Sequence, residues 1–317
     1  LGAYDEHYID SEDYNFNRSN PSDYVAAYDL SAGANLVSFS VLPDDRSVGN
    51  IFSCDCVSSV IGQGQAAQCF NGNWVGSLTE IAESSGYWLL LDQDCTQINV
   101  GSKSIQTEFD LAEGANLLSY TCNADLSIAQ AADNECVSGV IGEGEAAQNF
   151  NGNWVGSLTD LSPGKGYWFK ADCATTLSYD CPEASQDLAR TAEVEEEKLY
   201  AQSTQQSFYF FENIERIQIG DRIDAYNGDV LVGSRIWSGS YSDVPVMGQD
   251  MQESTKSYCI NGSIPSFKVV KQNGEVYDIT GDVPSWSSNG MHMVETMSVL
   301  EAPTSYALLN AYPNPFN

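Results

Sequence analysis

Short stretches of alternating apolar and polar residues, separated by glycine-containing turns, run through most of the chain. Residues 35–39 and 116–120 each follow a glycine turn and alternate as a half-buried strand does. Residues 86–89 and 166–169 have the composition of aromatic strands. The pattern therefore predicts an all-β protein.

Much of this pattern occurs twice, at an offset of 80 residues. Residues 60–79 read VIGQGQAAQCFNGNWVGSLT and residues 140–159 read VIGEGEAAQNFNGNWVGSLT, which agree at 17 of 20 positions. The Asn-Gly pair in each copy favours a hairpin, because both residues accept a positive φ. A short helix is predicted at residues 47–51 and at the equivalent residues 127–132. We expect two copies of one β unit, each a compact barrel or sandwich.

Beyond the second copy the pattern changes twice. An acidic stretch without hydrophobic periodicity predicts a solvated linker. An aromatic strand at residues 208–211 and two strand–turn–strand segments, 224–233 and 267–279, then predict a sandwich with an Ig-like plan. The predicted divisions are an extended N-terminal arm (1–27), β repeat 1 (28–108), β repeat 2 (109–181), an acidic linker (182–206), an Ig-like β-sandwich (207–302) and a C-terminal segment (303–317).

The two copies serve as an alignment for the cysteines. Cys56 matches Cys136, and Cys95 roughly matches Cys173. The simplest pairing that both copies can share is Cys56–Cys95 and Cys136–Cys173. Each bridge would add about 2–4 kcal/mol of stability by restricting the unfolded chain.

The remaining cysteines differ between the copies. Cys54 and Cys69 occur only in the first copy, and Cys122 and Cys181 only in the second. Residues gained or lost together suggest the further bridges Cys54–Cys69 and Cys122–Cys181. Cys259 is left over, and we expect it to be either free and buried or a link to another chain.

The net charge and the cysteines limit the possible partners of the protein and the compartment in which it works. The chain has 44 acidic and 13 basic residues, a net charge of −31. Such a field repels phosphate, which argues against nucleic acid and anionic membranes as partners. No apolar run approaches the ~18 residues of a membrane span, so no membrane insertion is expected. With two histidines and no CxxC pair, oxidised cysteines outside the cell are favoured over a zinc site.

Two segments carry a family resemblance. Residues 220–233, GDRIDAYNGDVLVG, resemble the "GDxIxAFxGDxCxG" β domain of secreted cell-surface proteins of Bacteroidetes-like bacteria, although that family often has a cysteine where Leu231 stands. Residues 308–317, LLNAYPNPFN, resemble the opening of a type IX secretion sorting domain, whose hallmark is "YPNPFNP". The repeats are similar to "GxNLxS…GYW" units of such exported proteins. The resemblance implies export across an outer membrane, followed by release or anchoring at the cell surface.

Two tryptophans are candidate glycan-binding residues. Trp74 and Trp154 follow the Asn-Gly turns at equivalent positions. An exposed indole can stack on a sugar ring. The alternative is that both anchor a core, as large aromatic residues usually do, and the same alternative holds for Trp88 and Trp168.

One turn of the third domain is a candidate cation site. Asp221, Asp224, Asn227 and Asp229 offer hard oxygen ligands that suit Ca²⁺. The run does not match an EF-hand loop, and turn chemistry explains Asn227 and Asp229 without a metal. The identity of any metal is unknown, and no other cofactor is expected.

The N-terminal arm is a candidate assembly element. It is acidic and rich in tyrosine, including Tyr4, Tyr8 and Tyr14, and it lacks an apolar period. It either lies along a neighbouring subunit, where it would add a strand to a sheet edge, or is a frayed terminus.

Catalytic motifs are missing from the sequence. There is no GxSxG elbow, no HExxH pair and no cysteine–histidine arrangement. We expect a non-catalytic, secreted structural protein at the cell surface or outside it. It would be a subunit of a surface filament or an adhesin, self-associating through β-edge or arm contacts. The alternatives are an array of carbohydrate-binding modules and a non-catalytic part of an exported hydrolase.

Overall fold

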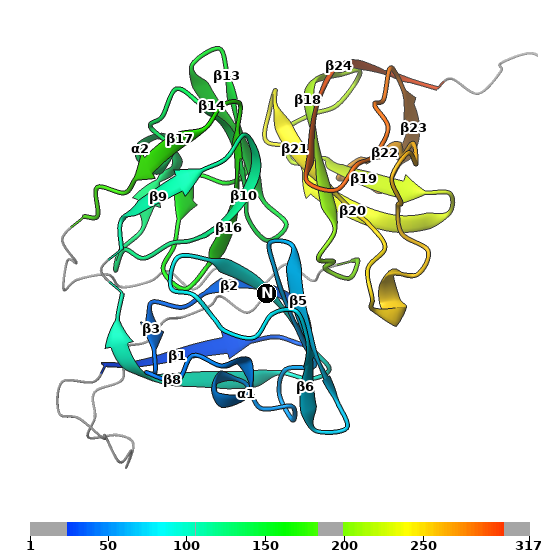
Figure 1. Cartoon of the computed structure of the whole chain (residues 1–317). Coiled ribbons are helices and arrows are strands. Elements are labelled where there is room, and N and C mark those ends of the chain that lie inside the picture. Colours follow the sequence, from blue (N-terminus) through cyan, green and yellow to red (C-terminus); the bar gives the residue numbers. More distant parts are fainter. Residues whose placement is uncertain (1–23, 105, 183–198, 301–317) are drawn as a thin grey trace, which may run out of the picture.

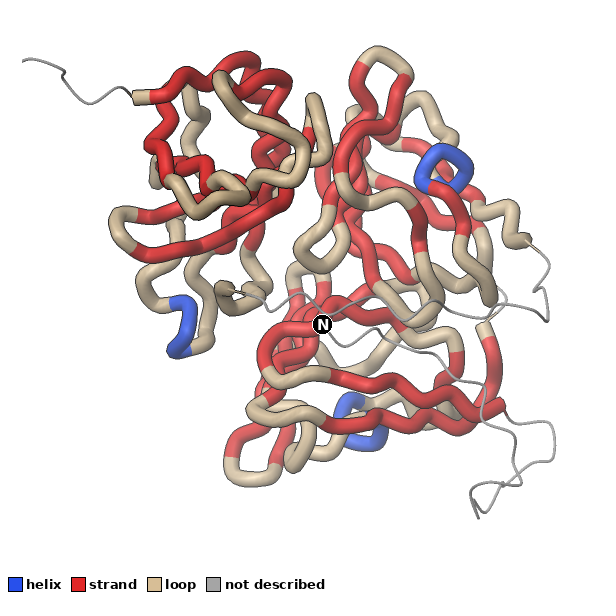
Figure 2. Tube along the Cα trace, turned by 180° about the vertical axis from the view of Figure 1, so that it is seen from behind, coloured by secondary structure: helices blue, strands red, loops and turns tan. Residues whose placement is uncertain are grey.

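The fold consists of three β domains. The computed structural model describes residues 24–104, 106–182 and 199–300, and strands dominate this part of the chain. The predicted all-β class is confirmed. Repeat 1 lies at the bottom of Figure 1, repeat 2 at the upper left and the third domain at the upper right; Figure 2 shows the same arrangement from behind. In the described residues no helix is long and apolar enough to span a bilayer.

Repeat 1 packs two sheets around one core. Its larger sheet has the order β2 (Gly33–Ser38), β7 (Gly86–Leu91), β4 (Ser59–Gly62), β5 (Gln65–Phe70) and β6 (Asn73–Gly76). The smaller sheet is β1 (Tyr24–Leu30), β8 (Cys95–Lys103) and β3 (Val41–Leu42), and the helix α1 spans Val48–Ile51. Alternate residues of both sheets, such as Tyr28, Val37 and Tyr87, form the core between them.

Repeat 2 has the same plan. Its five-stranded sheet has the order β10 (Gly114–Ser119), β16 (Gly166–Ala171), β12 (Val137–Ile141), β13 (Ala146–Phe150) and β14 (Asn153–Gly156). Two short pairs, β9 (Glu108–Leu111) with β17 (Thr175–Ser178) and β11 (Leu126–Ser127) with β15 (Asp160–Leu161), take the place of the smaller sheet. The helix α2 spans Ile128–Ala131, so both predicted helices are present.

The Asn-Gly turns form as predicted. Asn71 and Gly72 have φ values of 52° and 76°, and Asn151 and Gly152 have 53° and 85°. Both residues of each turn are therefore left-handed, which a two-residue hairpin between twisted strands requires. These turns connect β5 to β6 and β13 to β14.

The third domain is a seven-stranded sheet folded over on itself. Its order is β20 (Val230–Ile236), β19 (Arg222–Asn227), β22 (Ser266–Val270), β23 (Val276–Thr280), β24 (Gly290–Val299), β18 (Gln206–Ile214) and β21 (Ser242–Met247), and a single 3₁₀ turn spans Glu253–Thr255. Among the described strands of this sheet, β18 and β24 alone pair in parallel. The two ends of the sheet approach closely, because a Cβ atom on Gly233 would lie 1.6 Å from the Pro245 carbonyl oxygen.

Two predicted boundaries are wrong. Residues 24–27, assigned to the arm, are part of β1 and pair with β8. Residues 199–206, assigned to the linker, pack on the third domain, where Tyr200 contacts the core and Ser203 is fully buried. This polar stretch is buried because Asp250 accepts hydrogen bonds from Ser203 Oγ and the Thr204 N–H. Tyr4, Tyr8, Tyr14, the rest of the linker and the segment 303–317 lie outside the described residues.

The two repeats contact each other through reciprocal hydrogen bonds. The Leu36 N–H donates to Glu143 Oε2 at 3.0 Å, and the equivalent Leu117 N–H donates to Gln63 Oε1 at 2.8 Å. This contact from repeat 1 to repeat 2 is thus matched by an equivalent contact in the opposite direction. This reciprocity defines an isologous interface with a local two-fold axis.

Two glycines lie near this axis. A Cβ atom on Gly86 would lie 2.8 Å from the Leu118 carbonyl oxygen, and one on Gly166 would lie 2.7 Å from the Val37 carbonyl oxygen. The close approach lets the hydroxyls of Ser38 and Ser119 donate to main-chain carbonyls of the other repeat. Any larger residue at either glycine would force the repeats apart.

The third domain packs on repeat 2. Phe208 and Phe210 of β18 lie against Ile141 and Ala146, and all four side chains are fully buried. Because both domains bury apolar side chains here, they form one continuous core across the boundary.

Polar contacts surround this second interface. Ser157 Oγ donates to Asp243 Oδ2 at 2.8 Å, and Arg235 Nη2 donates to the Gly144 carbonyl oxygen at 2.7 Å. They fix the direction in which the third domain faces repeat 2.

Replacing Phe210 with alanine should destabilise the full chain by about 3–5 kcal/mol, because it leaves a cavity between two domains. Chemical denaturation of the full chain measures this change. Ile264→Ala is the control, because its side chain is 69% exposed and its loss should cost less than about 0.5 kcal/mol. Equal effects of the two substitutions would contradict the interface.

Candidate functional site

Disulfides connect eight of the nine cysteines. The pairs are Cys54–Cys69, Cys56–Cys95, Cys122–Cys181 and Cys136–Cys173, which are the pairs that the two copies suggested. Four disulfides indicate an oxidising, extracellular environment. Cys259 is free and fully buried, and burial raises the pKa of its thiol to about 11. A buried thiol cannot reach a second chain, so the alternative in which Cys259 forms such a link is wrong.

The candidate tryptophans belong to the cores. Trp74 is half-buried against the core of repeat 1, and its Nε1 donates to the Phe52 carbonyl oxygen at 3.1 Å. Trp154 is half-buried in the same way in repeat 2. Trp88 and Trp168 lie between domains rather than at the surface. Glycan stacking on Trp74 or Trp154 stays a prediction, since each ring keeps some exposed surface.

The structure contradicts the candidate cation site, because two of its three carboxylates, Asp221 and Asp224, already have cationic partners. Asp221 is 1% exposed and accepts hydrogen bonds from Lys271 Nζ and the Gln218 N–H. Burial alone would raise the pKa of Asp221, but these hydrogen bonds outweigh it and hold the pKa below its usual value.

The other members of this group face different partners. Asp224 binds the Arg222 guanidinium through both oxygens, at 2.8 and 2.9 Å. Asn227 Nδ2 donates to the Ser257 carbonyl oxygen, and Asp229 is exposed. In the described part of the chain, no three His, Cys, Asp or Glu side chains are arranged to hold a metal ion.

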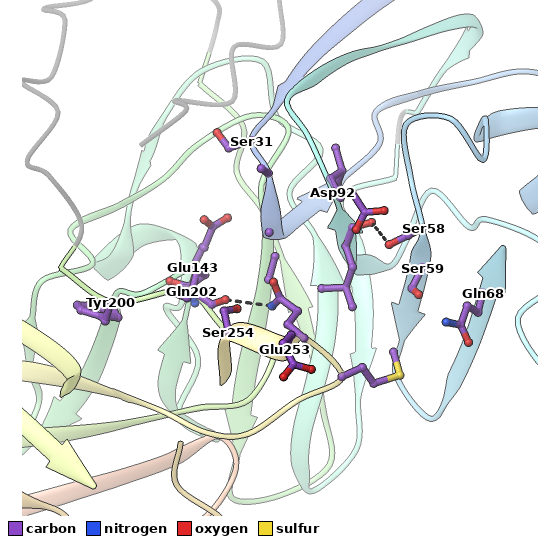
Figure 3. A pocket seen from close by; sticks show the side chains of 18 residues that line it. Ser31, Ser58, Ser59, Gln68, Asp92, Glu143, Tyr200, Gln202, Glu253 and Ser254 are labelled. Carbon is purple, nitrogen blue, oxygen red and sulfur yellow. Dashed lines mark hydrogen bonds between the residues drawn. The ribbon is translucent and has the colours of Figure 1, made fainter. Parts of the chain in front are cut away.

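A cleft of about 830 Å³ opens where the three domains meet. One wall is the outer face of the repeat 1 sheet, meaning the face away from the repeat 1 core. Repeat 2 contributes Glu143, and the third domain contributes residues 200–202 and 251–254. Figure 3 shows Ser58, Ser59 and Gln68 on one side of the cleft and Tyr200, Gln202 and Glu143 on the other.

The wall from the third domain is held by a single carboxylate. Asp250 accepts hydrogen bonds from the Gln252 N–H at 2.9 Å, from Thr255 Oγ1 at 2.6 Å and from the Thr204 N–H at 2.9 Å. Gln252 Nε2 then donates to the Gln202 carbonyl oxygen at 3.1 Å. Asp250 therefore positions both segments that line the cleft.

The lining of the cleft combines polar and apolar groups and contains no cationic side chain among the described residues. Its hydroxyl, amide and carboxylate groups belong to Ser31, Ser58, Ser59, Ser254, Tyr200, Gln68, Gln202, Gln252, Asp92, Glu143 and Glu253. Leu90 and Met251 add apolar surface. This composition favours neutral or cationic ligands and disfavours anions.

No pattern in the sequence pointed to this cleft. Its residues come from three domains and from segments as far apart as Ser31 and Ser254. No motif links them, because the cleft exists only once the domains have packed.

Comparisons with known proteins do not place the chain in a family. No family model matches it, and neither does any curated protein. Among solved structures it is similar to gamma-CGTase from alkalophilic Bacillus clarkii, with 10% identity over 88% of this chain and a TM-score of 0.17. The match spans 38% of that enzyme's chain. At this TM-score the similarity carries no information on activity.

The Asp250 network predicts a pH dependence. Burial would raise the pKa of Asp250, but the hydrogen bonds from Thr255, Thr204 and Gln252 hold it below its usual value. The charged carboxylate therefore stabilises the fold above its unfolded pKa of about 3.9, and the contribution is lost as the pH falls through the folded value.

Asp250→Asn should lower the thermal midpoint at neutral pH, and its difference from the wild type should shrink below about pH 4. Thermal melts across this range measure the difference. Asp229→Asn, an exposed carboxylate, is the control and should match the wild type throughout. A difference for Asp250→Asn that is the same at pH 7 and pH 3 would contradict the assignment.

Proposed function

We propose that this protein is a secreted, non-catalytic adhesive protein that binds a neutral, polyhydroxylated ligand, such as a glycan, in the cleft between its three domains. The observation behind this proposal is the composition of the cleft, which combines many hydrogen-bonding groups with no cationic side chain among the described residues.

The chemistry of the lining suits a sugar. A sugar hydroxyl both donates and accepts hydrogen bonds, and the Ser and Gln side chains of the cleft do the same, while Asp92 accepts them. Leu90 and Met251 offer apolar contact to the C–H faces of a ring. The volume falls in the range of about 300–1,000 Å³ that is usual for ligand sites.

A binding role is favoured over catalysis because two of the three carboxylates of the cleft are engaged elsewhere. Glu143 accepts the hydrogen bond from the Leu36 N–H, and Glu253 forms an ion pair with Lys256. A glycosidase needs two carboxyl groups free to act on one bond. The alternative of a non-catalytic part of an exported hydrolase has the same cleft and the same ligand class.

An adhesin is favoured over a filament subunit by the arrangement of the repeats. The isologous contact between repeats 1 and 2 is satisfied within one chain, so it does not itself join chains head to tail as a fibre contact would. Export by type IX secretion is part of this proposal, and it rests on the resemblance of residues 308–317 to a sorting domain.

The proposal predicts a preference for uncharged glycans. The full chain, applied to a glycan array and then titrated with the best neutral oligosaccharide, should bind neutral structures above sialylated or sulfated ones. Gln68→Ala should weaken binding by about 5–10-fold, because it removes one hydrogen-bonding amide.

Gln249→Ala is the matched control, because this exposed glutamine lies outside the cleft lining. Trp74→Phe tests the alternative of stacking on Trp74. Binding to anionic glycans only, an unchanged affinity for Gln68→Ala, or a loss confined to Trp74→Phe would each reject the cleft as the glycan site.

A further inference from the structure

The outer face of the repeat 1 sheet carries exposed apolar side chains. Phe70 of β5 is 65% exposed and Val75 of β6 is 52% exposed. Ala66 is exposed beside them, and Ile61 of β4 is half-buried. We name these four residues the repeat 1 face; Figure 1 shows its strands β5 and β6 at the edge of the molecule.

The equivalent surface in repeat 2 is an interface. Ile141 and Ala146, the counterparts of Ile61 and Ala66, are fully buried under the third domain. Val155 packs into the same cluster, and the Phe150 ring lies 5.3 Å from that of Tyr241. In repeat 2 two of these side chains are thus fully buried and two half-buried, whereas in repeat 1, as far as the chain is described, three of the four are exposed.

Repeat 1 has the same apolar residues that form this interface in repeat 2. The four apolar residues are identical in the two repeats, and the hairpin that carries them has the same register. In repeat 2, where the structure shows what covers the equivalent face, the covering element is a β-sheet. We expect the occupant on repeat 1 to be a β-sheet as well.

The distribution of charge along the chain indicates which β-sheet covers the repeat 1 face. Residues 56–79 contain no charged side chain, although the whole chain carries a net charge of −31. A cationic partner would gain no electrostatic attraction by docking on this uncharged segment. A second copy of the chain meets this uncharged segment with an equally uncharged segment, so like-charge repulsion is smallest there.

The repeat 1 face also continues an established interface. Ile61 packs beside Trp88 and Leu90, and these lie in the cluster that joins the two repeats. The apolar surface therefore runs from the buried contact between repeats 1 and 2 outward to Phe70 and Val75.

We infer that two copies of this chain associate through the repeat 1 face, sheet against sheet, about a two-fold axis. The contact is isologous, so it closes as a dimer and does not propagate. It spans three short strands, a small area for a protein interface, and its dissociation constant should be on the order of micromolar. The contact also covers Gln68 of the cleft wall, because Gln68 lies between Ala66 and Phe70 on the same face of β5 and pairs with Val75 of β6.

Sedimentation velocity of the full chain over a concentration series tests the inference. The wild type should shift from monomer to dimer, and Val75→Asp and Phe70→Asp should each raise the dissociation constant at least about tenfold, because each brings a carboxylate into the contact. Salt should strengthen the wild-type dimer, because it screens the repulsion between two strongly acidic chains.

Ile219→Asp is the matched control, because this residue of the third domain is 73% exposed and far from the repeat 1 face in the sequence. It should dimerise as the wild type does. Val75→Cys should form a disulfide-linked dimer on mild oxidation, and Ile219→Cys should not. Circular dichroism confirms that each variant is folded.

Three results would overturn the inference. One is a wild type that stays monomeric up to about 0.5 mM, far above a micromolar dissociation constant. Another is a dimer that tolerates both Val75→Asp and Phe70→Asp. The last is a dimer lost in Ile219→Asp, which would move the contact to the third domain.

Discussion

The close approach of the two repeats at Gly86 and Gly166 is the contact on which the arrangement of this protein depends. With no side chain at either position, the main chains come close enough for Ser38 and Ser119 to hydrogen-bond across the boundary. The reciprocal contacts fix a two-fold relation between the repeats. The third domain then packs on one of them, and the cleft is the space left beside the other.

A few residue differences between the two repeats explain why the third domain packs on repeat 2 and not on repeat 1. A Cβ atom on Gly139 would lie 2.5 Å from Met291 Sδ, and repeat 1 has Ser59 at the equivalent position. Lys170 Nζ donates to the Asn289 carbonyl oxygen, and repeat 1 has Leu90 there. Because the third domain fits repeat 2 better, the outer face of repeat 1 is left to form the cleft and to carry exposed Phe70 and Val75.

The candidate cation site, which the structure contradicts, shows a limit of prediction from local sequence. Asp221 and Asp224 are close in sequence and rich in ligand oxygens, as a calcium loop is. Their actual partners are Arg222, two residues away, and Lys271, 50 residues away. Since β22 ends beside β19, Lys271 reaches Asp221, and no spacing rule within the turn anticipates that contact.

The sequence by itself determined the all-β class, the repeated unit with its Asn-Gly hairpins, and the pairing of the cysteines. These depend on local periodicity, on turn residues that need positive φ, and on differences between two copies of one motif. Only the tertiary structure decided how the copies face each other, which of them holds the third domain, and that a cleft lies among all three. Contacts between domains join residues that share no periodicity or spacing in the sequence. They depend on how the surfaces of folded domains pack, so no local stretch of sequence predicts them.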